Sequence, residues 1–196
     1  MKQIESLVDS CVSKGYITHE LAPWLHYGIE RRVMTLVISV PMLIIGSVIS
    51  SPAMSFSFYA SFYLLRSRTN GIHAKTPGRC FWLSIIGEYI FLGLLSRIWN
   101  ISLAIILLMP SVVSIIFLAP FNHPNMNLST DEISGCRKSA RRRLIALLGL
   151  LIVFHVIQQD QLATGISLGI VMVATTLTFA YLPKGDESNE AATSHY

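Results

Sequence analysis

Long apolar runs separated by short polar connections dominate the sequence. Six runs stand out, at residues 33–50, 52–65, 81–96, 98–119, 144–157 and 162–182. A helix needs about 20 residues to cross the hydrocarbon core of a bilayer. The first, fourth and sixth runs are close to that length, and the others would need flanking residues or a locally thinner bilayer. The pattern predicts an all-α, polytopic membrane bundle of about six transmembrane helices, with four spans and a re-entrant hairpin as the alternative.

The basic residues predict how these helices are oriented. If the amino terminus lies in the cytoplasm, six spans place fourteen of the 15 Lys and Arg residues on the cytoplasmic side and only Arg97 outside. Cytoplasmic loops of membrane proteins are enriched in Lys and Arg, and an odd number of spans would scatter these charges. Both termini are therefore expected in the cytoplasm.

The two ends of the chain differ from its centre. Ile4, Leu7, Val8 and Cys11 repeat at the spacing of an amphipathic helix, and a second such segment follows a break at Gly15. Residues 1–32 are thus expected to form amphipathic helices at the cytoplasmic surface, and residues 33–182 the transmembrane bundle, within one membrane domain at 1–182. The polar residues 183–196 are expected to be a disordered tail.

Composition narrows the possible functions. Hydrophobic residues make up 52% of the 196 residues and charged residues only 13%, against roughly 25% charged in a soluble domain. The net charge of +4 is explained by the orientation of the helices in the membrane, so it does not indicate a nucleic-acid partner. Cys11, Cys80 and Cys136 show neither paired spacing nor a metal-ligand pattern, so we expect no disulfide, metal or cofactor.

The connection between the second and third apolar runs carries the clearest candidate chemistry. It contains His73 and Cys80, and Cys80 falls where the third run begins. A cysteine at a helix amino terminus faces the positive end of the helix dipole, which favours the thiolate. A nearby imidazole could accept the thiol proton and later protonate a leaving amine, as in thiol peptidases. The alternative is an ordinary cysteine at a membrane boundary beside a solvated basic loop.

This segment resembles the signature of a known family. It reads Arg66, then Gly71-Ile72-His73-Ala74-Lys75-Thr76, then Arg79-Cys80. The accessory gene regulator B (AgrB) family of bacterial membrane peptidases has an arginine, a glycine-containing stretch ending in His-Ala, and a cysteine seven residues beyond the histidine. Ile72 departs from the family pattern, in which a small or polar residue is common. The resemblance implies that Cys80 is the nucleophile and His73 the base, with Arg66 and Gly71 in supporting roles.

The resemblance also implies a substrate and a location. The enzyme would be a cysteine endopeptidase that cleaves an amphipathic, AgrD-like precursor of an autoinducing peptide through an acyl-enzyme thioester. It would then promote cyclisation to a thiolactone or lactone quorum-sensing pheromone. The protein would lie in the bacterial cytoplasmic membrane with its active site facing the cytoplasm, and a homodimer is a possibility at the family level.

Other polar residues have competing interpretations. The cluster formed by Arg137, Lys138, Arg141, Arg142 and Arg143 fits an anchor on anionic lipid, or a contact with an acidic substrate tail. His123 and Cys136 form a rival, less favoured pair, because nothing in the sequence fixes their geometry.

Glu88 is the one acidic residue inside an apolar run, and it could orient His73 or form a hydrogen bond within the bundle. A transporter without covalent chemistry is the alternative function. Against it, the apolar runs offer little to line a polar pathway.

Overall fold

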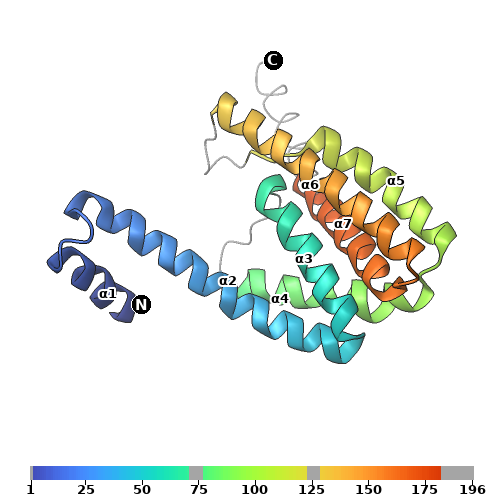
Figure 1. Ribbon diagram of the computed structural model, residues 1–196, viewed down its shortest axis with the longest axis horizontal. Helices are drawn as coiled ribbons and strands as arrows, with labels where there is room; N and C mark the ends of the chain where they lie inside the picture. Colours follow the sequence, from blue (N-terminus) through green and yellow to red (C-terminus); the bar gives the residue numbers. More distant parts are fainter. Residues whose placement is uncertain (1, 71–76, 123–128, 182–196) are drawn as a thin grey trace, which may run out of the picture. The chain divides into compact units, whose positions relative to one another are not determined.

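A computed structural model describes residues 2–70, 77–122 and 129–181, and every regular element among them is helical (Figure 1). The predicted all-α class is confirmed. The α-helices are α1 (Lys2–Ser13), α2 (Ala22–Ile49), α3 (Pro52–Thr69), α4 (Pro77–Glu88), α5 (Ile101–Leu118), α6 (Thr130–Val156) and α7 (Asp160–Tyr181). Short helices are η1 (His19–Leu21), the π-helix η2 (Tyr89–Leu94) and the 3-10 helix η3 (Leu95–Ile98).

The chain forms two compact units, Met1–Pro41 and Met42–Tyr196. In the first unit, α1 buries Val8 and leaves Leu7 exposed, as expected of an amphipathic helix. The predicted break occurs at Gly15, where φ is +72°, a left-handed conformation that glycine adopts readily. The second amphipathic segment differs from the prediction, because it continues without interruption into the first apolar run as the single helix α2.

The second unit is built around α7, which is the most deeply buried of its helices and contacts α3, α5 and α6 (Figure 1). The main hydrophobic core joins all four helices through residues such as Leu65, Ile115, Leu144 and Ile170. Because lipid is as apolar as these side chains, helices in a membrane associate mainly through close packing and polar contacts. The position of small residues therefore decides which helices approach most closely.

Helices α3 and α7 meet through two pairs of small residues. A Cβ built on Gly165 would lie 2.0 Å from Ser57 Oγ, and one built on Gly169 would lie 2.1 Å from Ser61 Oγ. Neither serine needs a partner on α7, since Ser57 Oγ donates to Met54 O and Ser61 Oγ donates to Ser57 O within α3. Four-residue spacing on both helices thus produces a close contact between them.

Four helical segments in the described chain are long and apolar enough to cross a membrane. They are His19–Ile49, Phe81–Ile98, Ile101–Leu118 and Asp160–Tyr181. The predicted spans at 52–65 and 144–157 do not meet that standard. The composition explains why: the α3 face that packs on α7 carries serines, and the first half of α6 carries the basic cluster.

Helix α3 nevertheless extends over the same length of the bundle as α7. At one end Ser51 Oγ donates to Gln161 Oε1 over 3.0 Å. At the other end Phe121 N donates to Thr69 O, and the Phe121 ring packs edge-on against Tyr181 with centroids 5.0 Å apart. Since α7 is one of the four candidate spans, this arrangement favours a crossing by α3 as well. The count of six spans stays a prediction.

Candidate active site

The predicted nucleophile lies in the first turn of α4. Pro77 is the first residue of this helix, a position where its missing N–H costs nothing, and Cys80 follows three residues later. The structure describes only the backbone of Cys80, whereas Gly71 and His73 lie outside the described residues. The helix start that the sequence predicted for Cys80 is therefore present, and its pairing with His73 stays a prediction.

The chain leaves α3 through a well-braced turn. Asn70 ends the helix with φ 56° and ψ −145°, a conformation that is unusual for a residue other than glycine. Its side-chain Nδ2 donates to Phe121 O over 3.3 Å, and its carbonyl accepts a hydrogen bond from Arg66 Nη1. Arg66 thus lies at the point where the chain departs towards Gly71 and His73. This contact braces the end of α3, and the supporting role predicted for Arg66 in the active site stays a prediction.

Three cations of the basic cluster donate to other helices. Arg137 Nε donates to Ala119 O over 3.2 Å and Arg141 Nη2 donates to Ile116 O over 3.0 Å, both at the end of α5. Carbonyls at the end of a helix lack intrahelical partners and carry the negative end of the dipole, so these two arginines cap α5. Arg143 Nη1 donates to Leu64 O and to Ser67 Oγ of α3, each over 2.7 Å, and so ties α6 to α3. We call this end of the bundle the arginine end.

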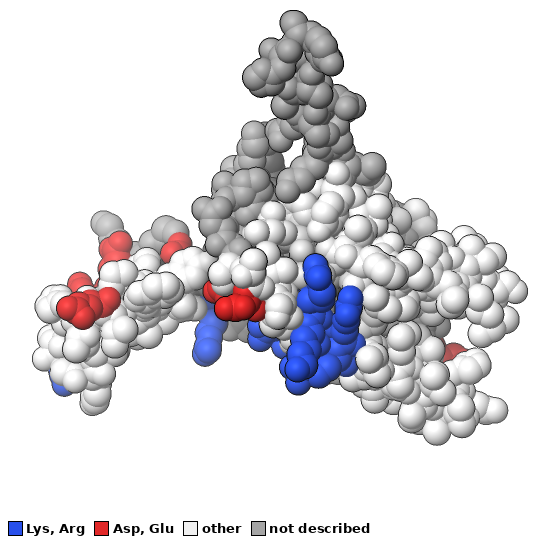
Figure 2. All heavy atoms as spheres, turned by 90° about the horizontal axis from the view of Figure 1, so that it is seen from above, with Lys and Arg blue, Asp and Glu red and all other residues white. Residues whose placement is uncertain are grey.

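Lys138 and Arg142 differ from these three arginines. Both are exposed, and neither makes a hydrogen bond or ion pair with any residue in the described part of the chain. Their four-residue spacing places them side by side on α6. Figure 2 shows Lys and Arg side chains gathered on one face over the first half of α6. Within the predicted cluster, these two cations are the ones available to an anionic lipid or an acidic peptide.

Replacing Lys138 and Arg142 together by glutamine is expected to reduce the binding of an acidic peptide severalfold at low ionic strength while leaving the melting temperature unchanged. The difference from the unmodified protein should shrink as salt is added, because salt screens exposed charges. The matched control replaces Arg137 and Arg143 by glutamine, which should lower the melting temperature because carbonyls of α3 and α5 lose their donors. Equal loss of stability in both variants would contradict this division of roles.

Glu88 lies at the junction of α4 and η2 with its side chain completely buried. It is eight residues beyond Cys80, which corresponds to about 12 Å along a helix axis. The hydrogen bond predicted for it within the bundle is absent among the described residues, since neither carboxylate oxygen has a partner there. Its predicted role in orienting His73 is untested because His73 is outside the described residues.

The rival pair of His123 and Cys136 stays untested, and Cys11 is the remaining cysteine. Cys11 lies in α1, in the first unit, and Cys136 lies half-buried in α6. His123 falls outside the described residues. No group of three or more His, Cys, Asp or Glu side chains in the described ranges could hold a metal ion.

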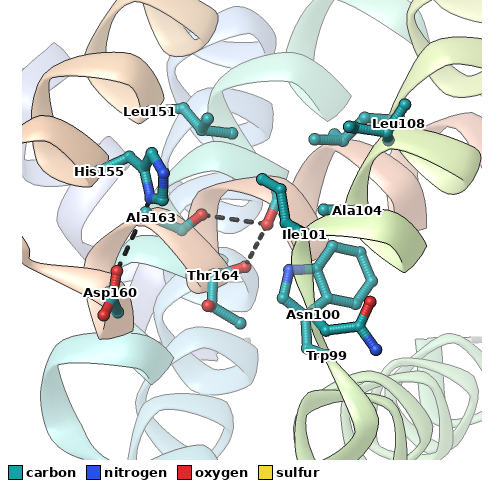
Figure 3. A pocket seen from close by; sticks show the side chains of 12 residues that line it. Trp99, Asn100, Ile101, Ala104, Leu108, Leu151, His155, Asp160, Ala163 and Thr164 are labelled. Carbon is teal, nitrogen blue, oxygen red and sulfur yellow. Dashed lines mark hydrogen bonds and ion pairs between the residues drawn. The ribbon is translucent and has the colours of Figure 1, made fainter.

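A cavity of about 410 Å³ opens at the opposite end of the bundle from the arginine end. Its walls come from the starts of α5 and α7 and the end of α6, and Leu108 and Leu151 line its apolar part (Figure 3). At its rim His155 Nδ1 lies 3.7 Å from Asp160 Oδ1. About 27 Å of helix separates His155 from Arg137. No signal in the sequence indicated this cavity, because its walls come from three helices that only the tertiary structure brings together.

These features define a helical membrane protein with a cysteine at the start of an apolar helix and a cationic face on one end of its bundle. Comparison with known families gives a more specific result. The accessory gene regulator B family matches residues 4–177, which is most of the chain. The chain therefore belongs to the accessory gene regulator B family, as the motif from Arg66 to Cys80 indicated. No curated protein and no solved structure matches it.

Family membership implies a general activity. Members are peptidases that process the precursors of autoinducing peptides in quorum sensing, and an AgrD-type precursor is the implied substrate. The several apolar helices agree with a multi-pass membrane protein.

Proposed function

We propose that this protein is a membrane cysteine endopeptidase in which Cys80 attacks the precursor of an autoinducing peptide and His73 transfers the proton. The observation that carries the proposal is the position of Cys80 in the first turn of α4, within a chain that the family matches almost throughout. Backbone N–H groups in the first turn of a helix lack intrahelical acceptors. They favour a thiolate and could also stabilise an oxyanion.

The proposed reaction proceeds in two transfers of one acyl group. The Cys80 thiolate attacks the carbonyl carbon of the scissile peptide bond, the C–N bond breaks, and His73 gives its proton to the departing amine. The product of this step is a thioester between Cys80 and the amino-terminal part of the precursor. A cysteine thiol or serine hydroxyl within that peptide then attacks the thioester, releases Cys80 and closes a thiolactone or lactone ring.

This order has a physical reason. Exchange between two thioesters is nearly balanced in energy, whereas water would hydrolyse the acyl-enzyme irreversibly. An active site at a membrane boundary can limit the access of water during the second step. The braced turn at Asn70 and the arginines bound to α3 and α5 would hold the site in place beside the membrane.

The proposal places the arginine end, and with it the start of α4, in the cytoplasm. In a cysteine-free variant, a single cysteine introduced by Gly135→Cys should resist a membrane-impermeant maleimide added to intact cells. A single cysteine introduced by Gln159→Cys should react, because it lies at the other end of α6. Both positions are exposed, and a Cβ at Gly135 meets open space. After lysis both cysteines should be labelled. If they are, then labelling of both cysteines in intact cells, or of neither, would contradict a crossing by α6.

A further inference from the structure

The carboxyl group of Glu88 is isolated inside the second unit. Its side chain has 0% of its surface exposed, and neither oxygen has a hydrogen-bond partner among the described residues. An ionisable side chain at such a position in a membrane protein is costly, and it normally has a partner or a function. The proposed peptidase mechanism uses no group at this depth. Glu88 therefore requires an explanation separate from that mechanism.

The absence of a side chain at Gly46 makes room for the carboxyl group of Glu88. A Cβ built on Gly46 of α2 would lie 2.5 Å from Glu88 Oε1 and 2.4 Å from Ser55 Oγ of α3. The carboxyl group and the serine hydroxyl thus both lie against the bare backbone at Gly46. Ser55 Oγ donates to Leu43 O over 3.3 Å, which leaves its lone pairs available to accept a hydrogen bond. A protonated carboxyl group has a hydrogen to donate, and this oxygen lies against the same point of the α2 backbone.

Among the described segments that pack near Glu88, none supplies a cation to pair with an ionised carboxylate. The segments packed near it, residues 42–49, 52–65 and 162–181, contain no Asp, Glu, Lys, Arg or His. Their titratable side chains are Tyr59, Tyr63 and Tyr181, and Tyr89 follows Glu88 in η2; a phenol has no cationic form that could pair with a carboxylate. Along the chain the nearest cations are Arg79 and Arg97, each nine residues from Glu88, and Arg97 is exposed. Burying a carboxylate without a cation costs much more than protonating it.

The helix geometry changes at the same residue. The α-helical hydrogen bonding of α4 ends at Glu88, and the π-helix η2 begins at Tyr89. Single π-helical turns are rare and occur frequently at functional sites. This backbone feature is independent of the burial of the side chain and marks the same position.

We propose that Glu88 is an intramembrane proton-binding site, in which the neutral acid joins α4 to α2 and α3 beside Gly46 and Ser55. The ligand is a proton, not a metal cation. Since α4 also carries Cys80, proton binding by Glu88 would hold in place the helix that presents the nucleophile. The proposal does not depend on the chemistry at Cys80 and can be tested in a Cys80→Ala protein.

Infrared difference spectroscopy tests this directly on the full chain in proteoliposomes. The spectrum of the unmodified protein minus that of Glu88→Gln at neutral pH should contain the C=O stretching band of a protonated carboxylic acid. That band should shift to lower frequency in D₂O. Carboxylate bands in its place would overturn the proposal. Glu88→Gln is expected to fold, since a neutral amide has nearly the same shape, and its melting temperature provides that check.

The same measurement distinguishes a bound proton from a bound sodium ion. The acid band should be equal in sodium chloride and in choline chloride if the ligand is a proton. Loss of the band in sodium chloride, with carboxylate bands replacing it, would show a sodium site and overturn the proposal. Asp160→Asn is the matched control, because Asp160 is an exposed carboxyl group on α7 and its difference spectrum should contain carboxylate bands in both salts.

Discussion

Replacing Cys80 by alanine is expected to reduce precursor cleavage by at least about 1,000-fold, because loss of a covalent nucleophile removes the acyl-enzyme pathway. Membrane insertion should be retained, since the side chain is small and the residue lies in the first turn of α4. Cys80→Ser should be nearly as inactive, because a hydroxyl group beside one imidazole is a much poorer nucleophile than a thiolate. Cleavage is measured by mass spectrometry of the released tail in proteoliposomes.

The controls and a trapping experiment make this prediction specific. Cys11→Ala and Cys136→Ala should retain cleavage, since one residue lies in the first unit and the other in α6. A precursor whose internal ring-closing cysteine is replaced by alanine cannot complete the second transfer. A hydroxylamine-sensitive adduct should then accumulate on Cys80. An adduct on Cys136, or cleavage by the Cys80→Ala protein, would show that the assignment is wrong. A transporter would form no such adduct.

Replacing Gly169 by leucine is expected to separate α3 from α7 and destabilise the folded bundle by more than about 3 kcal/mol. The new Cβ would lie 2.1 Å from Ser61 Oγ and 2.8 Å from the backbone oxygen of Phe58. A side chain can rotate away from such a contact, but the backbone of α3 cannot move without loss of the packing around Phe58, which is completely buried. The free energy of unfolding can be measured by titration with a denaturing detergent.

Gly149→Leu provides a matched control for this substitution. Gly149 lies in α6, and a Cβ built there meets nothing within 4 Å. This variant adds the same side chain to a membrane helix without a clash, and leucine favours the helix over glycine by somewhat under 1 kcal/mol. Its stability should be equal to or slightly above that of the unmodified protein. Equal loss in both variants would mean that the α3–α7 contact is not what the substitution disrupts.

Much of the architecture could be predicted from the order of residues alone. Long apolar runs require helices, because a backbone in lipid must satisfy its own hydrogen bonds, and all described elements are helical. The motif from Arg66 to Cys80 indicated the family, and its spacing places Cys80 at the start of a helix. These features depend on local sequence, and local sequence was sufficient to find them. The sequence did not predict that α2 is one continuous helix, because an amphipathic helix and a membrane span can join without a break.

Other features are decided by contacts between residues far apart in the chain. Mean hydropathy does not identify α3 as a membrane span, because the helix carries polar serines. These serines are buried against glycines of α7 that lie more than a hundred residues away in the sequence. In the sequence the five cations of the basic cluster look equivalent. In the structure three of them bind α3 and α5, whereas Lys138 and Arg142 have no partner among the described residues. Glu88 is isolated because the parts of α2 and α3 that pack near it, residues 42–49 and 52–65, contain no cation. Each of these outcomes depends on which helices pack together, and only the tertiary structure shows that.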